Sequence, residues 1–167
     1  ATAKKNWEYF AGAGVYRTPM FWEGKLYFGS EDGWAYCLEA KTGKLIWKFQ
    51  AAPASRLFLS YGKMISVWPV RTDVLVDKGE AYFSAGVFPH EGTYVYPLDA
   101  NTGRLKWRND TQSEDGGQSS LAPGGHLMVT RDQIWVPKDF RGYSNMPYGA
   151  PTSFRRSNGI FTHWPDP

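Results

Sequence analysis

One pattern in this chain recurs at a spacing that few folds accommodate. Residues 24–49 (GKLYFGSEDGWAYCLEAKTGKLIWKF) hold three short runs rich in aromatic and aliphatic residues, separated by turns that contain Asp-Gly and Thr-Gly. Aromatic residues favour strands, and glycine accepts the positive φ that a tight hairpin turn requires. The stretch therefore predicts a three-stranded antiparallel meander, which needs neighbours of the same kind to bury both of its faces.

The same pattern returns further along the chain. Residues 98–107 (LDANTGRLKW) repeat the pattern of residues 38–47 (LEAKTGKLIW), and 81–83 (AYF) repeats 26–28 (LYF). An enlarged turn at 87–92 accounts for the slightly different spacing of the two parts. A weaker third copy runs from 127 to 164, with Ile134 to Val136 and Phe154 to Gly159 in the matching places. A leading strand that carries Arg17 or Arg71 precedes the first two copies and brings each unit to four strands. Four-stranded units that repeat every ~40 to 60 residues predict an all-β fold, the β-propeller.

The repeats divide the chain into about three blades of a partial ring. We expect residues 1–16 to form the end of a preceding blade, 17–50 a blade, 51–66 an insertion with a helical turn, 67–109 a blade, 110–120 a polar linker, and 121–167 a degenerate blade. Propellers usually have about four to eight blades. The expected partners are therefore the remaining blades of a longer propeller, further copies of this chain, or another protein.

Composition excludes several classes of function. The net charge of +3 comes from scattered residues and not from a basic stripe, so no nucleic-acid partner is expected. The single cysteine, Cys37, allows no internal disulfide, no multi-cysteine zinc site and no attached haem. No apolar run is long enough to predict a membrane-spanning helix.

Two segments carry a family resemblance. CLEAKTGKLIW, from Cys37 to Trp47, and PLDANTGRLKW, from Pro97 to Trp107, resemble the quinoprotein-type propeller repeat, Ala-x-Asp-x-x-Thr-Gly-Lys-x-x-Trp. The chain departs from that pattern at Cys37, Glu39, Pro97 and Arg104. In the family the Thr-Gly pair closes a hairpin and the tryptophan packs between blades, so the resemblance predicts a structural role for both tryptophans.

The resemblance implies two kinds of function. One group in the family binds proteins as a non-catalytic platform, like the propeller lipoprotein of the outer-membrane assembly machinery. The other group oxidises alcohols or sugars with pyrroloquinoline quinone (PQQ) and calcium, usually beneath an adjacent cysteine pair that this chain cannot form. We expect a non-catalytic scaffold without a cofactor, in a periplasmic or extracellular bacterial protein. The alternative is a fragment of a PQQ-dependent alcohol or sugar dehydrogenase.

Two arginines are the main candidates for ligand binding. Arg17 and Arg71 occupy equivalent places, 10 and 11 residues before Tyr27 and Tyr82. We expect both on the innermost strands, lining the central channel, with Trp68 close by as a stacking surface. Guanidinium groups suit carboxylates, such as those of a quinone or an acidic peptide. The alternative is that each arginine pairs with a carboxylate of the neighbouring blade.

The other polar residues predict no catalytic group and no metal site. Asp99 and Asn101 are oxygen donors, but their place in a hairpin turn favours bonds to the local backbone. His90, His126 and His163 are 36 and 37 residues apart, which matches no metal-binding motif. We expect these histidines to be exposed or locally bonded.

Overall fold

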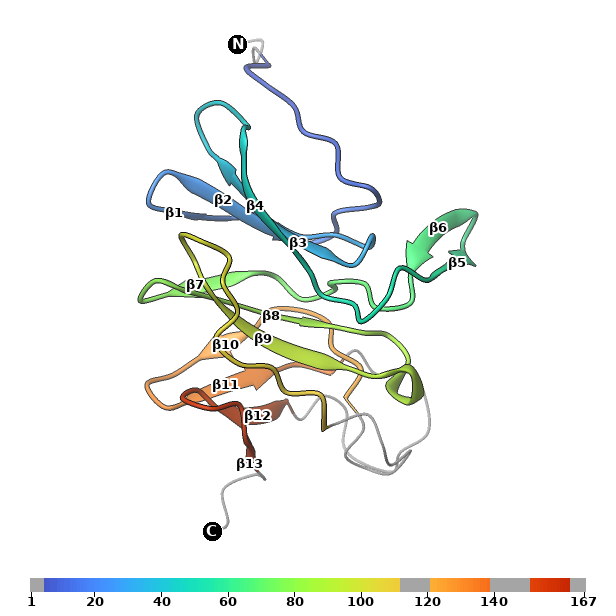
Figure 1. Ribbon diagram of the computed structural model, residues 1–167, viewed down its shortest axis with the longest axis vertical. Coiled ribbons are helices and arrows are strands. Elements are labelled where there is room, and N and C mark those ends of the chain that lie inside the picture. The colour runs from blue at the N-terminus through green and yellow to red at the C-terminus, as the bar shows by residue number, and fades with distance from the viewer. Residues whose placement is uncertain (1–4, 112–120, 139–150, 163–167) are drawn as a thin grey trace.

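The computed structural model describes residues 5–111, 121–138 and 151–162, and these fold into successive antiparallel sheets (Figure 1). The first blade contains β1 (Met20–Trp22), β2 (Lys25–Gly29), β3 (Trp34–Glu39) and β4 (Leu45–Gln50). The second contains β7 (Leu75–Asp77), β8 (Glu80–Ala85) and β9 (Tyr94–Asp99). The third contains β10 (Met128–Val129), β11 (Gln133–Val136), β12 (Thr152–Arg155) and β13 (Phe161–Thr162). In each sheet, strands that follow one another in the sequence are neighbours.

The second blade lacks a regular fourth strand, and Pro97 explains why. In the first blade Cys37 pairs with Trp47 within the ladder between β3 and β4. Pro97, on β9, accepts a hydrogen bond from the Lys106 amide but has no N–H to donate. The segment after the turn is therefore held by isolated bridges, at Leu105 and Asn109.

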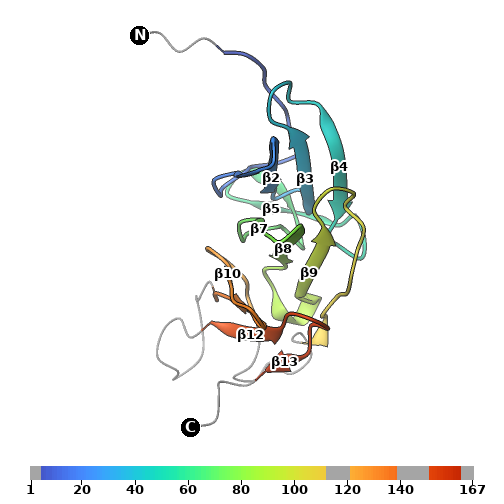
Figure 2. The ribbon, with the colours of Figure 1, turned by 90° about the vertical axis from the view of Figure 1, so that its left-hand side faces the viewer.

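The sheets stack into an arc, with β7 and β10 on its concave side and β4 and β9 on its convex side (Figure 2). In the middle strands of the first two blades, β2, β3, β8 and β9, alternate side chains point to opposite faces and both faces are buried. Tyr27 and Trp47 join a core shared with the second blade, whereas Phe28 packs against the N-terminal segment. In the same way Phe83 faces the first blade and Tyr82 faces the third. This two-sided burial explains why the strands show little polar-apolar alternation.

A β-hairpin, and not a helical turn, fills the insertion between the first two blades. It consists of β5 (Leu57–Ser60) and β6 (Lys63–Ser66), joined by a two-residue turn at Tyr61 and Gly62. Both turn residues have positive φ, 47° and 76°, as this tight kind of hairpin turn requires. The expected helical turn at 51–63 was therefore wrong, because alternating side chains in this short run serve two faces of a hairpin. The short 3-10 helix η1 (Pro89–Glu91) lies instead in the enlarged turn at 87–92.

A repeated tryptophan contact joins the blades. The indole of Trp47 donates to the Ala100 carbonyl (2.9 Å) and lies against Gly103 of the next blade. The indole of Trp107 donates to the Arg156 carbonyl (3.0 Å) and lies against Gly159 in the same way. The predicted structural role of both tryptophans is confirmed. The N-terminal segment makes this contact with the first blade, where Trp7 donates to Ala40 (3.0 Å) and lies against Gly43.

Candidate functional site

The two arginines singled out in the sequence line one cavity, although neither lies on a strand. Arg17 lies three residues before β1, and Arg71 four residues before β7, so both sit in the segments that lead into the innermost strands. The cavity has a volume of about 480 Å³. Its walls come from the first blade, from the segments before β1 and β7, and from the inserted hairpin: Tyr16, Arg17, Glu31, Ser60, Tyr61, Lys63 and Arg71.

Only one of the two arginines is neutralised by a carboxylate. Arg71 Nη2 lies 3.2 Å from Glu31 Oε1, and the Glu31 side chain is only 6% exposed. Glu31 belongs to the first blade, so Arg71 makes the cross-blade ion pair considered in the sequence analysis. Arg17 instead donates from Nε to the Arg71 carbonyl at 3.1 Å. Within the described residues, the terminal nitrogens of Arg17 have no recorded protein acceptor, which leaves them available to a ligand.

The cavity carries an excess of positive charge. Arg17, Arg71 and Lys63 contribute three cations, and Glu31 contributes one carboxylate. Because Glu31 is buried and already paired with Arg71, the charge left to attract a ligand is that of Arg17 and Lys63. A partly enclosed site of this composition favours an anion with more than one carboxylate or phosphate group.

Trp68 does not belong to this cavity. Its side chain is buried, and its indole donates to the Glu91 carbonyl at 2.6 Å. The guanidinium of Arg56 covers the ring at 5.2 Å. The predicted stacking surface beside Arg17 and Arg71 is therefore wrong, because Trp68 is engaged at the base of the insertion. The aromatic residues that do line the cavity are Tyr16 and Tyr61.

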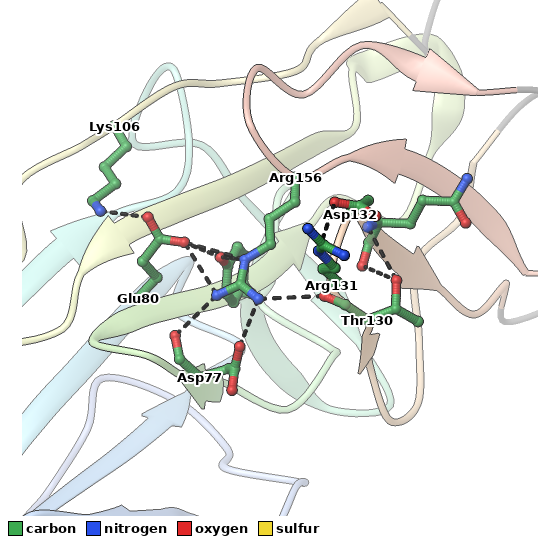
Figure 3. A network of polar contacts seen from close by, with 9 residues as sticks. Asp77, Glu80, Lys106, Thr130, Arg131, Asp132 and Arg156 are labelled. Atoms are coloured by element: carbon green, nitrogen blue, oxygen red, sulfur yellow. Dashed lines mark hydrogen bonds and ion pairs between the residues drawn. The ribbon is translucent and has the colours of Figure 1, made fainter.

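A charged cluster between the second and third blades was missed by the sequence analysis (Figure 3). The Arg156 guanidinium donates to Asp77 Oδ2 (2.6 Å) and to the Tyr82 hydroxyl (2.6 Å), and it lies 3.4 Å from Glu80 Oε2. Lys106 pairs with the other oxygen of Glu80. Burial alone would raise the pKa of the Glu80 carboxyl, but Lys106, Tyr82 and Arg156 together hold it below its usual value.

The repeat contains the signal that would have revealed this cluster. Arg156 occupies the place of Ala100, since the backbone carbonyl of each receives the interblade tryptophan. A charged residue at a position that holds alanine in other copies indicates a specialised contact. Because Arg156 is satisfied by residues of the second blade, we interpret the cluster as a clasp between blades and not as a ligand site.

Of the remaining polar candidates, Asp99 makes the expected local bonds, whereas the Asn101 side-chain oxygen accepts from Lys25 Nζ of the first blade at 2.9 Å. The Asp99 carboxylate accepts bonds from Thr102 and from the Asn101 amide, and these bonds, those from Thr102 first, lower its pKa. The His90 and His126 side chains are exposed, and His126 Nδ1 lies 3.1 Å from Asp73. His163 lies outside the described residues. Within the described part of the chain, no three His, Cys, Asp or Glu residues gather as metal ligands.

Cys37 is a core residue and not a reactive one. Its side chain is fully buried, and burial raises the pKa of its thiol to about 11. A thiol with so high a pKa is a poor nucleophile at neutral pH.

Among the described residues, no helix is long and apolar enough to cross a membrane.

Comparison with known proteins agrees with this architecture. The family model described as outer membrane protein assembly factor BamB, a PQQ-repeat model, matches residues 1–139. The chain belongs to the PQQ-like β-propeller repeat family. The resemblance noted in the sequence and the predicted all-β propeller fold are thereby confirmed.

Members of this family with curated names include bacterial quinone-dependent dehydrogenases. The dehydrogenase subunit of the quinone alcohol dehydrogenase of Gluconacetobacter polyoxogenes is 34% identical over 125 residues, 74% of this chain and 16% of that protein. The corresponding subunit of Acetobacter aceti is 31% identical over 156 residues, 83% of this chain and 20% of that protein. This chain therefore spans a fifth or less of these relatives.

Solved structures share the fold at lower sequence identity. Quinohemoprotein alcohol dehydrogenase ADHIIG of Pseudomonas putida HK5 superposes with a TM-score of 0.61 at 16% identity, covering 89% of this chain and 26% of that one. BamB of Moraxella catarrhalis superposes with a TM-score of 0.60 at 17% identity, covering 93% of this chain and 37% of that one. The same PQQ-like blades thus occur in an enzyme and in an outer-membrane assembly factor.

Proposed function

We propose that this chain is a propeller segment of a quinone-dependent dehydrogenase of alcohols or sugars, and that its cavity binds the quinone. The observation that carries the proposal is the partly buried Arg17, whose terminal nitrogens have no recorded protein acceptor among the described residues. The named relatives support dehydrogenase activity as the function, because those with at least 30% identity are quinone-dependent alcohol dehydrogenases. The scaffold favoured by the sequence analysis becomes the second candidate.

The residues of the cavity fit PQQ. The cofactor carries three carboxylates on a flat ring system, and the cavity offers the cations of Arg17 and Lys63 to bind them. Its volume of about 480 Å³ falls within the ~300–1,000 Å³ typical of small-molecule sites. The cavity does not fit a calcium ion, since among the described residues Glu31 is the one carboxylate that lines it, and Glu31 is paired with Arg71. We therefore derive no role for calcium from these residues.

The protein and the cofactor would contribute different things. PQQ, when bound, would supply the capacity for two-electron, two-proton oxidation of an alcohol to an aldehyde or ketone. Arg17 would hold a carboxylate through its free nitrogens. The Glu31–Arg71 pair would fix the position of Arg17, because Arg17 Nε is anchored on the Arg71 carbonyl.

A non-catalytic binding scaffold remains the second candidate. It is favoured by the family model, whose description is that of an assembly factor, and by the buried state of the single cysteine. In either case we propose a periplasmic or extracellular location in a bacterium, because the named relatives are bacterial and the matched model is described as an outer-membrane assembly factor.

The proposal is tested by cofactor titration together with a dye-linked assay of alcohol oxidation. We expect PQQ to quench the tryptophan fluorescence saturably and to support oxidation, both with and without added calcium. In Arg17→Met, the loss of a charge-assisted bond of ~1.5–3 kcal/mol should weaken PQQ binding by about 10- to 100-fold. Arg155→Met, an exposed change in the third blade, is the matched control. If PQQ supports no oxidation, the dehydrogenase proposal is wrong and the scaffold is favoured.

A further inference from the structure

The hairpin of β5 and β6 has two unlike faces. Leu57, Leu59 and Met64 share its outer face and are all more than half exposed. On the other face, Phe58 packs against Phe88 with ring centroids 5.3 Å apart. Ser60 pairs with Lys63 at the end of the ladder, and both of these polar residues line the cavity that contains Arg17. The hairpin thus presents its polar end to the proposed ligand.

The base of this hairpin is fixed to the charged floor of the cavity. The Ser66 amide donates to the Glu31 carbonyl at 2.7 Å, and Ile65 is buried. Arg56, just before β5, pairs with Glu91. Glu31 therefore contacts both Arg71, through its carboxylate, and the hairpin, through its backbone carbonyl. These contacts fix the position of the hairpin relative to the arginines.

The tip carries an aromatic residue where the backbone disfavours one. Tyr61 has φ of 47°, and its side chain is 94% exposed. Asparagine and glycine adopt this conformation at little cost, whereas a bulky residue there is strained. Glu23 and Lys78 hold the same place in the β1–β2 and β7–β8 turns, with φ of 45° and 50°. The conformation is therefore common to these turns, and what distinguishes Tyr61 is that its exposed side chain lines the cavity.

We infer that the hairpin tip forms the second half of the ligand site and selects a flat polycarboxylate. Arg17 binds one carboxylate on the inner side, Lys63 binds another on the outer side, and the Tyr61 ring covers the flat body between them. Within the described residues Lys63 has no recorded acceptor of its own, so its ammonium is available for this role. The inference rests on the proposed function and adds the two hairpin residues, Lys63 and Tyr61, that select a molecule with carboxylates on opposite sides of a flat ring.

The probe should be a flat polycarboxylate that has no redox chemistry, because binding can then be measured apart from activity. Benzene-1,3,5-tricarboxylate meets this requirement, and benzoate provides the comparison with a single carboxylate. Isothermal titration of the full chain should show saturable binding of the tricarboxylate, at least about tenfold tighter than benzoate. Higher salt should weaken the tricarboxylate more than benzoate, because more charge pairs are screened.

Two substitutions test the hairpin itself. Lys63→Gln should weaken the tricarboxylate by about tenfold or more and leave benzoate nearly unchanged, while Lys44→Gln in a distant turn should change neither. Tyr61→Asn should weaken binding yet keep or raise thermal stability, since asparagine suits the positive φ. Glu23→Asn, at the equivalent turn position, should match its effect on stability without any effect on binding.

The outcomes separate this inference from the proposed function. If the chain binds no tricarboxylate, or if Lys63→Gln and Tyr61→Asn bind it as tightly as the unmodified protein, the inference is wrong. If the tricarboxylate binds as described but PQQ supports no alcohol oxidation, the polycarboxylate site stands and the dehydrogenase proposal fails.

Discussion

At the scale of single residues, the contact between Trp47 and Gly103 decides how closely two blades approach. Gly103 has φ of 70°, and a Cβ built on it would lie 2.8 Å from the Trp47 ring. Gly79 has φ of 76°, but a Cβ there would meet nothing within 4 Å. The two glycines therefore separate the cost of backbone conformation from the cost of interblade packing.

We predict that Gly103→Ala destabilises the fold more than Gly79→Ala does. Both changes force alanine into a left-handed conformation, at a cost of ~1–2 kcal/mol. Only the change at Gly103 also pushes Trp47 out of its place, which should add about 1–3 kcal/mol. Urea denaturation of the two variants measures the difference. Equal losses would mean that the blades separate without cost at this contact.

Much of the architecture is predictable from individual residues, and the remainder depends on distant pairs. Thr42, Gly43 and Trp47 indicated the hairpin and the interblade contact, because these roles follow from local sequence. The repeat also placed Arg17 and Arg71 near each other. The two carboxylates that contact Arg156, those of Glu80 and Asp77, lie 76 and 79 residues away in the sequence. No local pattern specifies such pairs. The position of the inserted hairpin depends on the bonds from Ser66 to Glu31 and from Arg56 to Glu91, which are also distant in the sequence.

At the scale of elements, the Arg156 clasp makes the joint between the second and third blades sensitive to acid. The first blade has Trp22 and Lys25 in the places of the two carboxylates, and Lys25 Nζ lies 5.8 Å from the centre of the Trp22 ring. The pKa of Glu80 is lowered in the folded protein. Its contribution to stability is therefore present above the unfolded pKa of ~4.3 and is lost as the pH falls through the lower, folded value.

We predict that the free energy of unfolding falls between about pH 5 and pH 3, and that Glu80→Gln reduces the slope of this fall. The glutamine cannot be protonated, so the pH-dependent part of the clasp disappears. Thermal unfolding across this pH range is the measurement, and Glu23→Gln, at an exposed turn, is the control that should keep the full slope. Parallel pH profiles for the unmodified protein and Glu80→Gln would contradict the role assigned to Glu80.

The outer edges of the first two blades should also differ in their dynamics. β4 pairs with β3 from Trp34 to Leu38, whereas the segment after Gly103 has bridges only at Leu105 and Asn109. We predict that amides at 104–108 exchange their hydrogens at least about tenfold faster than those at 45–50. Hydrogen-exchange mass spectrometry resolves both segments. Equal protection would show that the missing Pro97 N–H does not weaken the edge.

At the scale of the whole molecule, each blade is completed by a tryptophan from the segment before it. Trp47 completes the second blade, Trp107 the third and Trp7 the first. The segment around Trp7 also covers an apolar cluster on the first blade made of Phe28, Tyr36, Leu38 and Trp34. Tyr9 packs edge-on against the Phe28 and Tyr36 rings, at 6.3 and 5.8 Å. The N-terminal segment therefore buries this face of the first blade.

We predict that removing residues 1–11 makes the chain self-associate, whereas removing residues 1–4 does not. The longer deletion exposes large side chains on the first blade, each contributing roughly 1.5–3 kcal/mol when buried, and uncovers a flat sheet face. The cavity at Arg17 lies on other elements and should keep its affinity for the tricarboxylate. Sedimentation velocity and light scattering measure the association over a range of concentrations. A monodisperse monomer after the longer deletion would contradict this prediction. It would show that the first blade needs no tryptophan segment from outside its own sheet.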